Sequence, residues 1–142
     1  MNSIMINNLK FILLFIPFMV NSQAREVAKI SPLGKLTARL DVGMDSKYYI
    51  YYVDSKIRIV DYCRTIKIGN KKKLINFKKS LLNAIKNKEK NKKIVLNKNI
   101  ITLNSSGNKR VYISITDKKN ITSGIKWLSI KQINVLIPES EF

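Results

Sequence analysis

Residues 71–93 read KKKLINFKKSLLNAIKNKEKNKK and hold ten lysines against a single acid, Glu89. Apolar side chains recur on one arc of this stretch when it is drawn as a helix with about 100° per residue. The pattern predicts an amphipathic helix from residue 71 to about residue 86, with Asn70 as its N-cap. Lys78 falls inside the apolar arc, so we expect its ammonium group to reach the rim along its aliphatic stem. Apolar residues are missing from 87–93, which predicts an exposed loop.

Strand patterns precede this helix. Residues 47–53 (KYYIYYV) combine aromatic and β-branched side chains on both alternating faces, which predicts a central strand. Residues 36–42 alternate apolar and polar side chains and predict a first strand. We expect residues 56–62 (KIRIVDY) to form a tight hairpin with the central strand, and residues 65–68 to add a short strand.

Further strand patterns follow the helix, at residues 94–103, as one broken strand or two short ones, and at residues 110–116. Ser129 and Gln132 form a capping box that opens a short helix, which ends before Pro138. The order of elements predicts an α+β fold with a single antiparallel sheet of about five to six strands, one amphipathic helix and a short C-terminal helix.

The N-terminal residues 1–24 have the layout of a secretory signal peptide. Lys10 precedes the apolar run FILLFIPFMV at residues 11–20, and Ser22-Gln23-Ala24 fits a small-x-small cleavage site. The run is shorter than the roughly 20 residues that a membrane-spanning helix needs. We therefore expect an exported protein, periplasmic or secreted, with residues 25–35 as an N-terminal arm and residues 36–142 as one globular domain.

The charge of the chain is strongly positive. Its 142 residues carry a formal net charge of +18, while hydrophobic residues make up 45% of the composition, enough for a packed core. Such a charge attracts polyanions. A second explanation is the Lys, Asn and Ile bias of an A+T-rich genome, which the low count of five arginines favours, because phosphate recognition prefers the planar guanidinium group. Composition leaves both explanations open.

The residue types that are missing exclude several kinds of active site. The chain has no histidine, which excludes Ser-His-Asp and Cys-His catalysis and histidine-containing zinc sites. Its single cysteine, Cys63, excludes an intramolecular disulfide and a cysteine-cluster metal site. We expect a buried thiol, with a free reactive thiol or an intermolecular disulfide as the alternative. Asp41 and Asp45 lie close together but lack the spacing of a calcium loop. The sequence gives no catalytic motif and implies no metal and no cofactor.

Our leading hypothesis is a non-enzymatic domain with a binding or structural role. The partner would be an anionic polymer, an anionic membrane surface or an acidic protein, and the contact surface would consist of exposed lysines. The predicted contact residues are Lys71, Lys72, Lys73, Lys79, Lys86, Lys88, Lys90, Lys92 and Lys93.

The alternative hypothesis is a small histidine-free enzyme or toxin similar to a ribonuclease. Such an enzyme would hold phosphate and move protons with lysine, arginine and tyrosine side chains. Its first candidates are Arg58, Arg64, Arg110 and Tyr62, because codon bias explains these residues least.

Three segments carry a resemblance to known sequences: FMVNSQA at residues 18–24, KYYIYYV at residues 47–53 and WLSIKQINVLIP at residues 127–138. In their layout they are similar to short exported proteins of unknown function from A+T-rich Gram-negative bacteria. The resemblance implies an address outside the cytoplasm and transfers no active residue.

Overall fold

The computed structural model describes residues 24–58 and 61–142. Except for Ala24, the predicted signal peptide lies outside the described residues.

The first half of the described chain forms an antiparallel sheet of four consecutive strands, in the order β1-β2-β3-β4. Its register places Ile50 of the tyrosine-rich strand between Leu40 and Ile66. Buried and half-buried side chains alternate along that strand, as its sequence predicts. The strands are β1 (Arg25–Ile30), β2 (Ala38–Val42), β3 (Tyr48–Val53) and β4 (Cys63–Gly69).

The second half repeats this order with another antiparallel sheet of four consecutive strands, β5-β6-β7-β8. A helix follows each sheet: α2 (Lys71–Lys86) after the first and α3 (Ile130–Leu136) after the second. Single turns of 3-10 helix lie at Pro32–Gly34 and Glu139–Glu141. The strands are β5 (Lys92–Leu96), β6 (Asn99–Ser106), β7 (Arg110–Thr116) and β8 (Thr122–Ser129).

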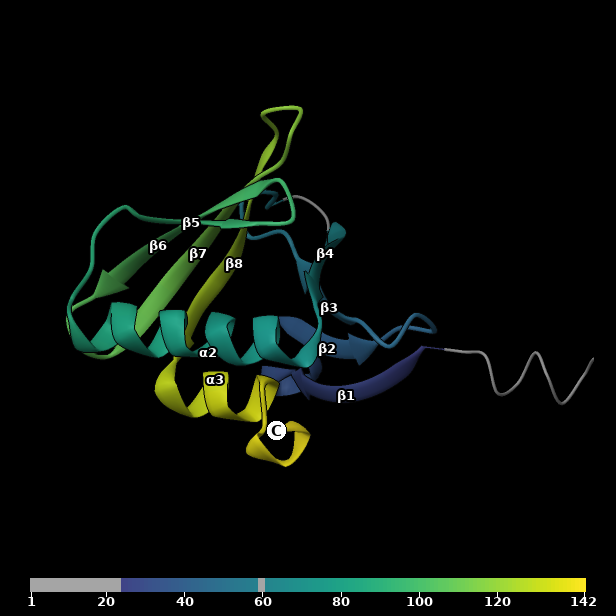
Figure 1. Cartoon of the computed structure of the whole chain (residues 1–142). Helices are drawn as coiled ribbons and strands as arrows, with labels where there is room; N and C mark the ends of the chain where they lie inside the picture. The colour runs from purple at the N-terminus through teal and green to yellow at the C-terminus, as the bar shows by residue number, and fades with distance from the viewer. Residues whose placement is uncertain (1–23, 59–60) are drawn as a thin grey trace, which may run out of the picture.

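The prediction of a single sheet of five to six strands is therefore wrong. Residues 25–30, which we expected to be part of an arm, form β1 and pair with β2. The segment after the β7–β8 loop, which showed no clear alternation, forms β8 and pairs with β7. Its burial pattern explains the weak signal, because Ser123, Gly124 and Ile125 are buried in succession. In addition, the four strands before α2 and the four strands after it pair only within their own set, which gives two sheets (Figure 1).

The predicted hairpin between residues 47–53 and 56–62 is also wrong. The partner of β3 is β4, with Val53 opposite Cys63 and Tyr51 opposite Thr65. The Asp54-Ser55 turn has no glycine to supply a positive φ. Instead, the Asp54 side chain is buried and its backbone N–H group donates to the Tyr62 backbone oxygen at 2.7 Å, and in the described residues the pairing of β3 with β4 starts at Val53 and Cys63.

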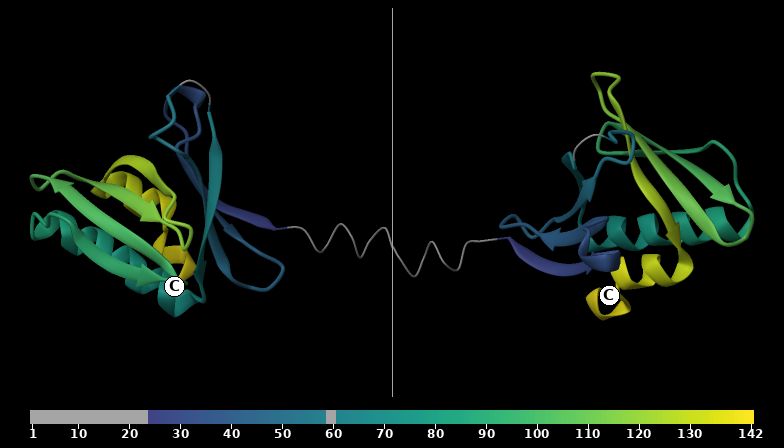
Figure 2. Two further views of the ribbon diagram at one scale, coloured as in Figure 1. Left: turned by 90° about the horizontal axis from the view of Figure 1, so that it is seen from above. Right: turned by 180° about the vertical axis from the view of Figure 1, so that it is seen from behind.

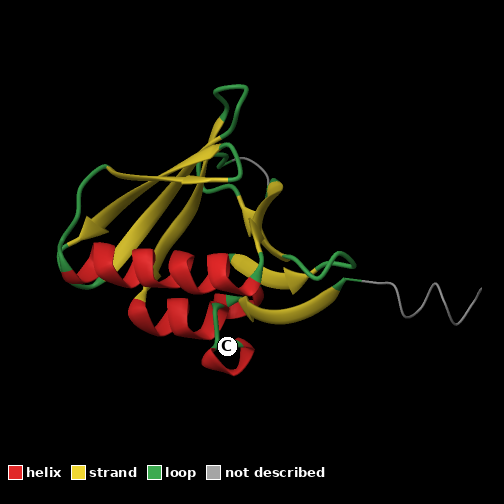
Figure 3. Cartoon of the chain, in the orientation of Figure 1, coloured by secondary structure: helices red, strands yellow, loops and turns green. Residues whose placement is uncertain are grey.

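The helices lie side by side and join the two sheets (Figures 1 and 3). Helix α2 contacts β6 and β7 as well as β4, whereas α3 contacts β1 and β2 as well as β8. Each helix therefore packs on both sheets. Figure 2 shows the sheets as separate layers that stand at an angle to each other.

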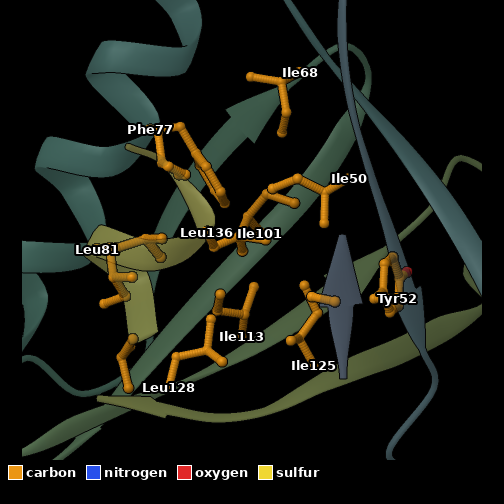
Figure 4. Packing of buried hydrophobic residues seen from close by; sticks show 14 of the residues in the cluster. Ile50, Tyr52, Ile68, Phe77, Leu81, Ile101, Ile113, Ile125, Leu128 and Leu136 are labelled. Carbon is orange, nitrogen blue, oxygen red and sulfur yellow. The ribbon is translucent and has the colours of Figure 1, made fainter. Parts of the chain in front are cut away.

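One core connects these elements, as Figure 4 shows. Ile50 from the first sheet, Ile113 from the second and Leu81 from α2 are at most 1% exposed. The predicted apolar arc of α2 is confirmed, since Leu74 and Phe77 are also buried against the sheets.

The β5–β6 turn contains Lys98 in a left-handed conformation with φ of 69°, after Asn97 with φ of 47°. Two positive φ angles define a type I′ turn, for which Asn-Gly is preferred. The left-handed conformation costs a residue with a Cβ about 1 kcal/mol. We expect Lys98→Gly to raise the free energy of unfolding by about 0.5–1 kcal/mol in urea titrations. The matched control is Lys93→Gly within β5, which is expected to lower it by a similar amount.

Candidate functional site

All nine predicted contact lysines are exposed, and along the chain they fall in α2, in the loop after it and at the start of β5. Lys72, Lys79 and Lys86 are seven residues apart, which places them on one line of the helix surface at intervals of about 10.5 Å. The apolar face of α2 is buried in the core. The helix therefore offers a partner its lysines and not a hydrophobic face, in contrast to helices that insert into membranes.

The electrostatics of α2 are unusual for a helix, because it contains six lysines and no acid. Lys71, Lys72 and Lys73 occupy the first turn, where the helix dipole already adds positive potential. Cations are disfavoured there by about 0.3–1 kcal/mol each. The stability of the helix therefore does not explain this placement, and the positive potential at this end of α2 is high.

Two of the nine lysines have partners within the protein. Lys73 Nζ donates to Asn97 Oδ1 at 3.2 Å, and the stem of Lys73 crosses Gly69, where an added Cβ would lie 2.7 Å from Lys73 Cδ. Lys90 Nζ donates to the backbone oxygen of Ser105. These two lysines connect α2 and its loop to the second sheet. Among the described residues, no acid lies within ion-pair distance of the other seven.

The ammonium group of Lys78 does not reach the rim of the apolar face of α2, contrary to our expectation. The residue is only 5% exposed, and its ammonium nitrogen has no hydrogen-bond partner among the described residues. It lies 5.2 Å from the centre of the Phe142 ring, which provides a cation–π contact. Lys78 is thus part of the interior and does not belong to the nine contact lysines, which we call the basic surface.

A groove of about 220 Å³ runs between α2 and β5. Phe77 and Ser80 line it from the helix, and Ile94, Val95 and Leu96 line it from the strand. At one end, Asn97 donates through Nδ2 to the backbone oxygens of Lys67 and Ile68, at 2.6 and 3.0 Å. These bonds anchor the β5–β6 turn to β4. Of the predicted contact lysines, Lys73 lines the groove.

A second hollow, of about 290 Å³, lies between the two sheets. Tyr62, Cys63 and Arg64 line it from the first sheet and its connection, and Asp117 and Ser123 line it from the second. The Arg64 guanidinium stacks on the Tyr62 ring at 4.9 Å. This cleft is polar and does not contain any of the predicted contact lysines.

Asp54 organises the junction between the sheets. Its carboxylate accepts hydrogen bonds from Arg64 Nε at 2.9 Å, from the backbone N–H of Gly124 at 3.0 Å and from that of Lys56 at 3.1 Å. Burial opposes the charged form, but the bonds from Arg64 and the two backbone groups outweigh it and hold the pKa of Asp54 below its ordinary value. Nearby, Tyr52 and Ser123 share a buried hydrogen bond of 2.6 Å, and burial raises the pKa of Tyr52.

The four candidate residues for a ribonuclease-like site do not all lie together in the structure. Arg64 and Tyr62 lie together at the cleft, but the Nε of Arg64 is committed to Asp54. Arg110 stacks on Trp127 at 5.4 Å. It begins β7, whereas the cleft lies near Ile115, roughly 17 Å further along that strand. Arg58 is exposed in the connection before β4.

Cys63 and the pair Asp41 and Asp45 were also considered from the sequence, as a thiol and as metal ligands. Cys63 is exposed at the edge of the cleft, so the predicted buried thiol is wrong. It is the first residue of β4. Asp41 is bound by Arg39 through two bonds of 2.9 Å, and Asp45 accepts from Tyr49 at 2.7 Å. Within residues 24–58 and 61–142, no cluster of metal-ligating side chains is present.

The sequence did not indicate Asp54 or the groove. Asp54 looks like an ordinary turn residue, and its partners Arg64 and Gly124 are 10 and 70 residues away. The groove depends on how far α2 lies from β5, which no local pattern encodes. Asn97 gave a partial signal, since asparagine favours positive φ in a hairpin turn.

No helix in the described part of the chain is long and apolar enough to cross a bilayer. No protein-family model, curated protein or solved structure matches this chain.

Proposed function

We propose that the protein is a non-enzymatic binding domain, exported to the periplasm or secreted, that holds an anionic polymer on the surface of α2 and β5. The observation that carries the proposal is the row of Lys72, Lys79 and Lys86 on a helix without any acid. A line of charges about 10.5 Å apart can contact a linear polyanion at several points without any change in the shape of the protein.

The first-turn lysines support the same function. They are placed where the helix dipole disfavours cations, and an anion bound there would be attracted both by the lysines and by the positive end of the helix dipole. An exposed set of lysines without acidic partners also keeps its full charge available for a ligand. Binding of this kind is expected to be sensitive to salt and tolerant of ligand sequence.

The experiment measures binding of a short DNA duplex, used as a polyanion of known charge spacing, across a salt series. If about six lysines contact phosphates, the affinity should fall by about 1,000-fold between about 50 and 200 mM salt. The triple variant K72E/K79E/K86E should reduce the slope of log K against log salt by about 2.7, which is about 0.9 for each lost contact.

The matched control is K35E/K118E/K119E, which changes the net charge by the same amount at exposed lysines outside α2 and β5. Lys118 and Lys119 lie in the β7–β8 loop, away from the helices (Figure 1). This variant should lose much less affinity than the α2 variant. Equal losses in the two variants would mean that only net charge matters and would contradict a defined surface, as would binding with little salt dependence.

A further inference from the structure

The free side of β5 presents backbone groups in a regular pattern. β5 is an end strand of its sheet and pairs only with β6. The two-residue turn makes Leu96 and Asn99 a hydrogen-bonded pair, so Val95 opposite Ile100 is a non-hydrogen-bonded position. Lys93 opposite Thr102 is the next non-hydrogen-bonded position. The N–H and C=O groups of Val95 and Lys93 therefore point away from β6.

These groups have no partner among the described residues. The opposite end strand, β8, is different, since its Gly124 oxygen accepts from Ser55 N at 2.8 Å. Proteins usually protect an open edge, because it can pair with another chain. Here the groove beside α2 leaves space along this edge, and Val95 is 77% exposed.

The side chains around this edge define what can lie there. Phe77, Ile94 and Leu96 form an apolar floor between helix and strand. Lys73 lines the groove from α2. Lys92 and Lys93, both exposed, precede Ile94 in β5. In an extended peptide, successive side chains point to opposite faces. A peptide that alternates apolar and acidic residues would place its apolar side chains on the floor of the groove and its acidic side chains on the outside.

We propose that the groove between α2 and β5 binds an extended acidic segment of a partner protein, which pairs with the free edge of β5 as a fifth strand. The proposal rests on the proposed function, because it uses Lys73, Lys92 and Lys93 from the same set of contact lysines, and it names the class of partner. Backbone hydrogen bonds to Val95 and Lys93 would fix the register of the segment, and the lysines would select for acidic side chains.

The test measures binding of a fluorescent peptide in which Glu and Val alternate, by anisotropy. Val95→Pro removes the outward N–H group and leaves the β5–β6 ladder intact, since proline is tolerated on the free side of an edge strand. We expect this variant to bind the peptide at least about tenfold more weakly, which corresponds to about 1.4 kcal/mol. Val95→Thr, which keeps the N–H group, is the matched control and should bind the peptide as the original protein does.

A second probe is the same peptide methylated on all of its backbone nitrogens, which keeps its side-chain charge but has no N–H group with which to pair as a strand. It should bind at least about tenfold more weakly than the unmodified peptide. Circular dichroism and urea unfolding establish that Val95→Pro is folded, and its binding to the DNA duplex should be unchanged.

The outcomes separate the two proposals. If Val95→Pro and the methylated peptide bind normally, strand pairing is contradicted while the basic surface stands. If the protein binds DNA but not the acidic peptide, the same conclusion follows. If it binds neither in a salt-dependent manner, the proposed function fails as well.

Discussion

Replacing Asp54 by alanine is expected to lower the free energy of unfolding by about 3–5 kcal/mol, the usual cost of removing one partner from a buried, charged network. The Asp54 residue is 1% exposed and binds Arg64, Gly124 and Lys56 at once. Without it, the N–H group of Gly124 is buried without an acceptor, and the first and second sheets lose a direct connection. Urea unfolding at neutral pH measures the loss.

One further variant at Asp54 separates the effect of its charge from that of its size, and a variant at Asp61 is the control. Asp54→Asn keeps the size of the side chain but removes its charge, so we expect a smaller loss of about 2–3 kcal/mol. Asp61→Ala removes an exposed carboxylate of the same connection and should change stability by at most about 0.5 kcal/mol. A loss below about 1 kcal/mol for Asp54→Ala would contradict the assigned role.

Asp54 also predicts how stability depends on pH. Its pKa in the folded protein lies below that of the unfolded chain, which is about 3.9. Its contribution is therefore fully present above the unfolded pKa and is lost as the pH falls through the folded pKa. Asp54→Asn should lose less stability than the original protein when the pH is lowered from about 5 to 2.

Replacing Lys78 by methionine is expected to raise the free energy of unfolding by about 1–3 kcal/mol. The ammonium nitrogen is buried without a hydrogen-bond partner among the described residues, and such a charge is costly. The contact with the Phe142 ring returns about 0.5–2 kcal/mol of this cost. Methionine has a similar length and fills the same space between α2 and its neighbours without any charge to desolvate.

The matched control is Lys79→Met, which makes the same change at the adjacent exposed residue of α2 and should alter stability by at most about 0.5 kcal/mol. Urea titrations of both variants provide the comparison. A destabilised Lys78→Met would show that the ammonium group has an acceptor in solution and would contradict a net cost of its burial. Lys78→Met should bind the DNA duplex normally, because Lys78 lies outside the basic surface.

Features that depend on neighbouring residues were predicted well. Helix α2 begins at Lys71 and ends at Lys86, and Asn70 Oδ1 accepts from Lys73 N at 3.0 Å as an N-cap should. The capping box of Ser129 and Gln132 is confirmed, with both of its hydrogen bonds present. Caps and amphipathic periodicity are set within a few residues, so the sequence contains the whole signal.

Features that depend on distant partners were predicted poorly. β1 and β8 were missed because their sequences lack regular alternation and are stabilised by pairing with β2 and β7. The division into two sheets was missed for a related reason. Which strands pair is decided by the contacts of the whole core, and a list of strand segments does not contain that information.

The strong positive charge, the positions of the lysines along the chain and the amphipathic character of residues 71–86 follow from the amino-acid sequence alone. Tertiary packing was needed to show that α2 and β5 form a groove between them, that Lys78 is buried and that the edge of β5 is open. The difference arises because charge and helical period belong to the residues and their near neighbours. Burial and an unpaired edge arise only when segments far apart in the chain pack together.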